Sequence, residues 1–194
     1  MSVLDIRVLG DPILRQETTL VAEVTDDVRR LIDDLFDTMR AARGIGLAAP
    51  QVGRTERVAV VDVEGGKQPI ALVNPEVVSG EGTIVGEEGC LSIPDVFGDV
   101  ERAASVVVRA LDRDGNPIEI RGTELLSRCL QHEIDHLHGK LFIDYLGVFK
   151  RRAALAKWSK LREQYPRYIR RLTEAEVGAG RHGGQGAHPS EEEM

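Results

Sequence analysis

The residues with the clearest chemical potential form one short run, His132-Glu133-Ile134-Asp135-His136. In a helix, two imidazoles four residues apart lie on one face and can share a metal ion, while Glu133 can reach a water molecule beside that ion. This spacing favours metal-dependent hydrolysis with Glu133 as the acid and base. From these residues alone, the main alternative is a histidine pair that is hydrogen-bonded in the core.

A catalytic site of this kind needs a third protein ligand. Cys129 shares the helix face of the two histidines, but it lies seven residues before His136. That separation is about 10 Å along a helix axis, so one straight helix can hardly place all three groups around one ion. The only other thiol is Cys90, and thiolates bind zinc and ferrous iron well. We therefore expect Cys90 as the third ligand and Cys129 as a packing residue in the pocket wall.

The element that must position the histidines is a helix over residues 123–137, with Thr123 as its cap and Gly139 placed to end it. One of its faces is apolar, and a second face carries the histidines and Cys129. Because both faces favour burial, we predict a central helix with the histidines inside the fold.

The remaining pattern predicts the α+β class, with antiparallel or mixed β-sheets packed around the metal-binding helix. An amphipathic helix is expected between Thr25 and Gly44, and a last helix over residues 148–164. Strands are expected at residues 57–63, 70–78 and 105–111, the last returning as a hairpin through 118–120.

Composition narrows the class of protein further. The chain has 194 residues, of which 42% are hydrophobic, which suits one domain over residues 1–171. We find no basic leader and no apolar run of membrane-spanning length, and two cysteines fit a reducing compartment, so a cytoplasmic protein is expected. The glycine-rich and acidic segment 176–194 is predicted to be disordered.

Charge is distributed unevenly. The net charge is −7, yet residues 150–171 contain nine basic residues and one acidic residue. The strongly acidic remainder argues against sequence-specific nucleic-acid binding, although the basic helix could dock on a phosphate-rich surface.

Three short motifs make the prediction specific. They are Gly44-Ile45-Gly46-Leu47-Ala48-Ala49-Pro50-Gln51, Glu88-Gly89-Cys90-Leu91-Ser92 and Gln131-His132-Glu133-Ile134-Asp135-His136-Leu137. In this order they resemble the motifs of the peptide deformylases, and the similarity covers about residues 3–160. The resemblance implies an enzyme that removes the N-formyl group from the initiator methionine of nascent chains and releases formate.

The same resemblance implies roles for single residues. Cys90 and the two histidines would hold one divalent ion, usually ferrous iron, with zinc or nickel as substitutes. Glu133 would move the proton, and the Gln51 amide and the backbone N–H of Leu91 would stabilise the oxyanion. From the residues alone, a loop glutamine and a core leucine would be the ordinary interpretations of these last two.

Substrate binding is expected at the first two motifs, because glycines allow a substrate strand to approach the backbone closely. The methionine side chain is expected against Ile45, Leu125, Cys129 and the ring of His132. Arg128 is less expected beside this face, and the hypothesis is that its stem lines the pocket mouth while its head reaches water. The expected substrate-binding residues are Gly44, Ile45, Gly46, Glu88, Gly89, Leu125, Arg128 and Cys129.

Two other functions remain alternatives. H-E-x-x-H also marks zinc endopeptidases, but their common layouts use neither the upstream cysteine nor the glycine-rich motif. A non-catalytic, metal-stabilised module that binds the ribosome through its basic end would leave Glu133 without a role. Some bacterial members of the resembled family contact the ribosome through a C-terminal helix, so residues 150–171 are a candidate for such a contact. A solvated helix face is the ordinary interpretation of these charges.

Overall fold

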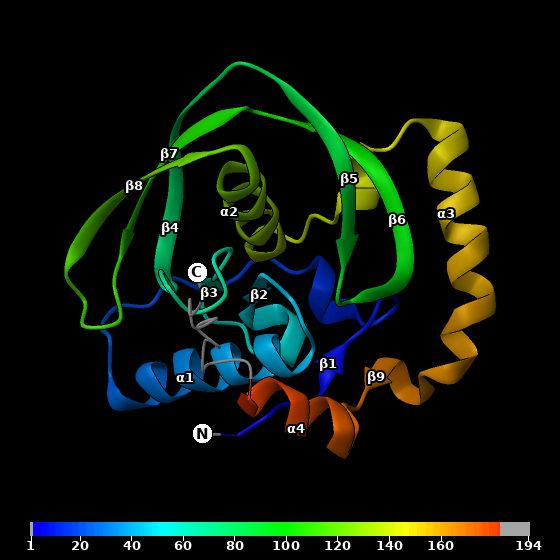
Figure 1. The fold of residues 1–194 in the computed structure, drawn as a ribbon, viewed down its shortest axis with the longest axis horizontal. Coiled ribbons are helices and arrows are strands. Elements are labelled where there is room, and N and C mark those ends of the chain that lie inside the picture. The colour runs from blue at the N-terminus through cyan, green and yellow to red at the C-terminus, as the bar shows by residue number, and fades with distance from the viewer. Residues whose placement is uncertain (1, 183–194) are drawn as a thin grey trace, which may run out of the picture.

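Helix α2 (Glu124–Leu137) lies at the centre of the computed structural model, which describes residues 2–182 (Figure 1). Strands curve around it, and its apolar face packs on the larger sheet, where Leu130 and Leu137 are fully buried. Thr123 is the residue before the helix, although its side chain makes no capping hydrogen bond, and Gly139 follows with φ +67°. The predicted α+β fold around a central helix is confirmed.

The larger sheet has five antiparallel strands in the order β2-β3-β4-β7-β8. β3 is an unbroken apolar run because helices cover both of its faces. Its side chains alternate between a core shared with α1 (Asp26–Ala41) and a core shared with α2. The strands are β2 (Gly46–Ala48), β3 (Val58–Val61), β4 (Ile70–Glu81), β7 (Ser105–Leu111) and β8 (Pro117–Thr123).

A second, two-stranded sheet covers the other side of α2 (Figure 1). It is the antiparallel hairpin of β5 (Ile84–Cys90) and β6 (Ile93–Arg102). Val96 and Val100 of β6 pack with Phe142 and Trp158 in a third core cluster. The sequence pattern did not predict this hairpin, because its outer face is exposed and β5 contains glycines and glutamates, which strands disfavour.

The outer helices hold the sheets in place. α1 begins after Thr25, whose Oγ accepts a hydrogen bond from the Val28 N–H at 3.5 Å. α3 (Val148–Leu161) lies outside β6 (Figure 1). None of the described helices has the length and apolarity that crossing a membrane requires. The short elements are β1 (Ile6–Arg7), η1 (Pro12–Arg15), η2 (Ala49–Val52), η3 (Phe142–Tyr145), η4 (Arg162–Gln164), η5 (Pro166–Tyr168) and β9 (Ile169–Arg170), which pairs with β1.

The end of the described chain differs from the prediction of disorder from residue 176. Residues Glu174–His182 form helix α4, which packs against α1. The physical reason is a reciprocal cap: Thr173 Oγ accepts from the Glu176 N–H at 3.3 Å, and the Glu176 carboxylate accepts from the Thr173 N–H at 2.7 Å. The rest of the predicted tail, 183–194, lies outside the described residues.

Candidate metal centre

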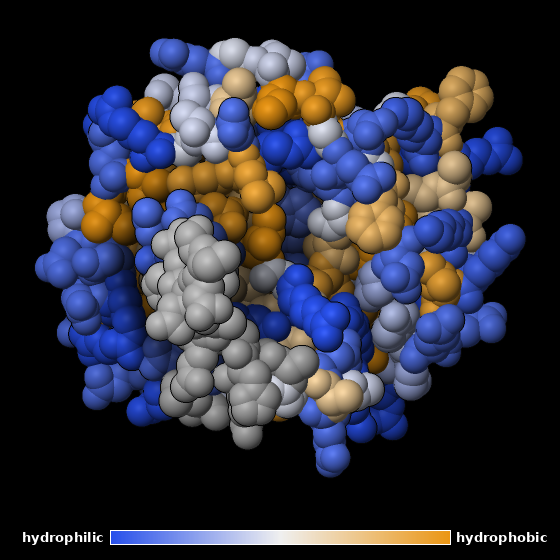
Figure 2. All heavy atoms as spheres, in the orientation of Figure 1, coloured by the Kyte–Doolittle hydropathy of each residue, from blue (hydrophilic) through white to orange (hydrophobic). Residues whose placement is uncertain are grey.

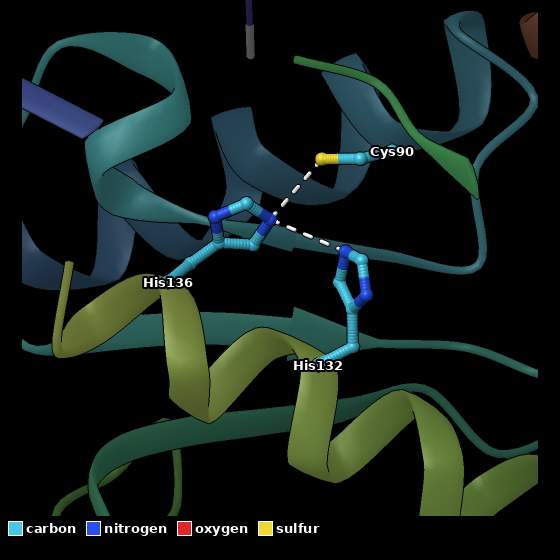
Figure 3. Close-up of side chains that lie close together, drawn as sticks. All are labelled: Cys90, His132 and His136. Atoms are coloured by element: carbon cyan, nitrogen blue, oxygen red, sulfur yellow. Dashed lines mark hydrogen bonds between the residues drawn. The ribbon is translucent and has the colours of Figure 1, made fainter. Parts of the chain in front are cut away.

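Three side chains from two elements meet at the end of β5 (Figure 3). Cys90 is the last residue of β5, beside a register shift in its pairing with β6, and the two histidines project from α2. Cys90 Sγ lies 3.2 Å from His136 Nε2, which lies 3.2 Å from His132 Nε2. Cys129 is buried nearby and donates its S–H to the Ile45 carbonyl, so the structure brings Cys90, and not Cys129, to the histidines.

This donor set fits a divalent cation. One sulfur and two imidazole nitrogens converge, with all three ligand atoms within 4.8 Å of one another. Thiolate and imidazole together suit zinc or ferrous iron. Burial lowers the pKa of His136 well below its usual value, which keeps its ring in the neutral form that a ligand needs.

Glu133 lies beside these ligands with only 4% of its surface exposed. Its Oε2 has no hydrogen-bond partner among residues 2–182. Burial raises the pKa of Glu133 to about 7, with the positive charge of His132 acting in the opposite direction. A carboxyl group with this pKa can both accept and return a proton near neutral pH.

A buried ionic network holds the ring of His132. His132 Nδ1 lies 3.0 Å from Oε2 of Glu88, and both oxygens of Glu88 also accept hydrogen bonds from Arg102, at 3.0 and 3.1 Å. Burial alone would raise the pKa of Glu88, but its hydrogen bonds with His132 and Arg102 lower it to about 2. Glu88 is therefore an anion that orients a candidate metal ligand. The carboxylate of Glu88, a residue expected in substrate binding, faces this network.

The network continues to the last turn of α2, at Asp135. Arg102 donates to Asp135 at 2.5 Å, and its guanidinium lies 4.4 Å from the centre of the Tyr145 ring, whose hydroxyl donates to Asp135 at 2.9 Å. Asp135 thus orients Arg102 and Tyr145 as a hydrogen-bond acceptor. Sequence reasoning missed Arg102 and Tyr145, because nothing in their local spacing links them to α2.

The hypothesis that the head of Arg128 reaches water is wrong. The residue is only 8% exposed, and its guanidinium donates to the carbonyls of Val100 at 3.2 Å and Gly86 at 2.7 Å and to Glu88 at 3.2 Å. Gly86 leaves room for it, since a Cβ there would lie 3.2 Å from the central carbon of the guanidinium.

Gln51 lies on η2, and its side chain contacts Cys90. Its Oε1 accepts from the Ala48 N–H at 2.8 Å, which directs its NH₂ group toward Ser92 Oγ at 3.1 Å and Cys90 Sγ at 3.5 Å. Leu91 is the next residue after Cys90, and its side chain packs over Gly44, where a Cβ would lie 2.8 Å from Leu91 Cδ1. Both predicted oxyanion residues are therefore beside the candidate ligands.

The rim of the centre is apolar and open. Figure 2 shows a hollow near the middle of the face in view, with both apolar and polar side chains on its rim. The exposed apolar residues from the surrounding elements are Ile45, Phe97 and Leu125. Within the described chain, β2 and β5 each pair with only one strand. Each therefore has a free edge on which an extended peptide could add.

Together, a buried helical histidine pair, a cysteine from a hairpin and an unpartnered carboxylate define a metal-dependent hydrolase of the α+β class. The family model of polypeptide deformylases matches residues 3–152, and the chain belongs to this family. It is thus an enzyme that removes the N-formyl group from N-formylmethionyl nascent peptides. The resemblance seen in the motifs is confirmed, and the endopeptidase and non-catalytic alternatives are set aside.

The similarity extends over most of the chain. A peptide deformylase of Alkalilimnicola ehrlichii is 53% identical over 166 residues, covering 84% of this chain and 93% of that protein. The crystal structure of a peptide deformylase from Legionella pneumophila has a TM-score of 0.81 at 48% identity, covering 84% of this chain and 97% of that one. The enzyme from Synechococcus elongatus, solved in complex with actinonin, has a TM-score of 0.76 at 42% identity, covering 80% and 86%.

Gly46 gives a first prediction, because the side chain of Glu133 lies directly against it. A Cβ at position 46 would lie 2.7 and 2.8 Å from Cδ and Cγ of Glu133. Gly46→Ala should therefore displace the carboxylate and lower the rate of formate release about 100-fold, the scale of a 1 Å misplacement, while metal content stays unchanged. Gly147→Ala is the matched control, since nothing lies within 4 Å of a Cβ there. Wild-type turnover in Gly46→Ala would contradict this account of Glu133.

Proposed function

We propose that Cys90, His132 and His136 bind the catalytic metal ion and that Glu133 transfers the proton during deformylation. The observation that carries this proposal is the convergence of three ligand atoms beside a buried carboxylate oxygen that has no hydrogen-bond partner in the described part of the chain. We further propose ferrous iron as the native metal, with zinc or nickel as substitutes, as the resemblance to the family implies; the mixed thiolate and imidazole set is compatible with all three.

The reaction is hydrolysis of a formamide to formate and a free amine. A bound divalent ion would supply Lewis-acid polarisation and lower the pKa of a water molecule. Glu133 accepts a proton from the attacking water and later donates it to the departing amine nitrogen as the C–N bond breaks. The amide of Gln51 and the backbone N–H of Leu91 stabilise the negative charge that develops on the formyl oxygen.

The substrate would lie in extended form along the free edges of β2 and β5. In this arrangement, residues 44–46 and Gly89 provide the backbone for an added strand. The methionine side chain would contact Ile45, Leu125, Cys129 and the ring of His132, which explains why apolar side chains are exposed at this rim.

Glu133→Gln tests the proton transfer with little change in shape. Turnover on a formyl-methionyl peptide should fall about 10²- to 10⁴-fold, whereas metal content should remain that of the wild type. Glu119→Gln on β8 is the control, because Glu119 is exposed and its carboxylate pairs with the exposed Arg109. Full activity in Glu133→Gln would refute the assigned role.

The proposed metal is tested by anaerobic purification followed by metal analysis. We expect about one iron per chain, since one three-ligand site is formed, and loss of formate release when a chelator removes the metal. Adding back ferrous iron, zinc or nickel should restore activity, with an unformylated peptide as the blank. No formate release with any metal would refute the proposed metal centre.

We also propose that the basic segment 150–171 makes a weak contact with the ribosome. α3 buries only Ala154 and Trp158, while Phe149 at its start is 89% exposed. Arg152, Lys157 and Lys160 are exposed and form no ion pair within residues 2–182. These free cations are suited to phosphate groups.

Replacing Arg152, Lys157 and Lys160 with glutamine should weaken cosedimentation with ribosomes. Each phosphate contact that is lost should reduce the slope of log affinity against log salt by about 1. The control is a triple replacement of the exposed Arg30, Lys67 and Arg121, which lie outside the segment. Equal cosedimentation of both variants would exclude the proposed contact.

A further inference from the structure

Arg128 joins the metal-binding helix to the hairpin that carries Cys90. Its Nη1 donates to the carbonyl of Val100 on β6 at 3.2 Å, and its Nη2 donates to the carbonyl of Gly86 on β5 at 2.7 Å. Gly86 and Val100 are cross-strand partners. One guanidinium from α2 therefore binds both strands of the hairpin at a single rung.

The same guanidinium completes the set of partners around Glu88. Oε1 accepts from Arg102 at 3.0 Å and from Arg128 at 3.2 Å. Oε2 accepts from Arg102 at 3.1 Å and faces His132 Nδ1 at 3.0 Å. A carboxylate offers about four acceptor positions, and all of them are filled. The two arginines fill three of these acceptor positions, so only one position on Oε2 remains for His132.

The relative placement of hairpin and helix sets the metal geometry, because Cys90 comes from one element and the histidines from the other. The hairpin has no strand pairing with the larger sheet among the described residues. His136 Nδ1 has no hydrogen-bond partner there either. Glu88 is consequently the side chain that orients His132, the one histidine of the pair with a carboxylate partner in the part of the chain that is described.

We propose that Arg128 is a positioning residue of the metal centre, which holds the Cys90 hairpin against α2 and keeps Glu88 in contact with His132. This inference rests on the proposed ligand set of Cys90, His132 and His136. Gly86 is part of the arrangement, since a Cβ at that position would lie 3.2 Å from both Cζ and Nη1 of Arg128.

Arg102 and Arg128 have different tasks in this network. Arg102 also pairs with Asp135 at 2.5 Å and packs on Tyr145, so Glu88 keeps two hydrogen bonds from Arg102 when Arg128 is replaced. Only Arg128 binds the two carbonyls of the hairpin. Its replacement should therefore loosen the ligand set while the buried carboxylate remains paired.

The test compares metal binding in the full chain for the wild type, Arg128→Met, Arg128→Lys and Arg109→Met. Methionine keeps an unbranched stem without the charge, and Arg109 is an exposed arginine on β7. Zinc affinity is measured by competition with a chelator, and the cobalt-substituted forms are compared by visible absorption. Thermal unfolding of the metal-free forms reports any general loss of stability.

We expect Arg128→Met to bind zinc about 10- to 100-fold more weakly and to show an altered thiolate-to-cobalt absorption band. Arg128→Lys should recover part of the affinity, because it retains a cation and a donor, and Arg109→Met should match the wild type. Wild-type affinity and an unchanged cobalt spectrum in Arg128→Met would overturn the inference, even if the metal-free variant melted earlier.

Two further outcomes need a separate interpretation: a wild-type protein without a thiolate band, and an Arg128→Met variant that does not fold. A wild-type cobalt form without a thiolate band would refute Cys90 as a ligand, and thus the proposed metal centre itself. If Arg128→Met does not fold, Gly86→Ala decides, because a Cβ 3.2 Å from Cζ and Nη1 shifts the guanidinium by a few tenths of an ångström without removing a hydrogen-bonding group. Weakened zinc binding in Gly86→Ala supports the inference, and unchanged binding overturns it.

Discussion

The carboxylate of Glu88 accepts hydrogen bonds from Arg102 and Arg128 and contacts the ring of His132, all in the interior of the protein. Removing charges from water is costly, so a buried ion is tolerated only when its partners fill its hydrogen-bonding positions. Glu88 and Asp135 balance the two arginines in charge. The histidine pair can therefore lie inside the fold beside an anion without leaving an uncompensated charge.

The surroundings of Glu88 and Glu133 shift the pKa values of these two carboxyl groups in opposite directions. Glu88 is surrounded by cations, and its pKa is about 2, whereas Glu133 is buried without a partner for Oε2, and its pKa is about 7. Groups whose pKa values are driven apart in this way can be assigned different tasks. A permanent anion suits the orientation of His132, and a carboxyl group that titrates near neutrality suits proton transfer.

The sequence predicted those parts of the site that depend on local pattern. Helical periodicity located α2, and the rise per residue excluded Cys129 as a ligand beside His136. The buried network was not predictable, because Glu88, Arg102 and Asp135 are distant in sequence and meet only through an irregular hairpin. Arg128 shows the limit most clearly: the sequence placed it beside the histidine face, but its partners are two backbone carbonyls and a carboxylate on the hairpin. The cap at Thr173 carried a local signal for α4 that composition alone concealed.

The free edges of β2 and β5 lie beside the candidate metal centre. An unpaired edge strand favours aggregation unless it is short or charged. β2 is only three residues long, and β5 carries the exposed charge of Glu87 near its end. β5 ends at Cys90, and Gly46 of β2 lies against Glu133. In the proposed arrangement, a peptide added to these edges would bring its N-terminal formyl group toward Glu133, so that the exposed backbone and the buried carboxylate would serve one substrate geometry.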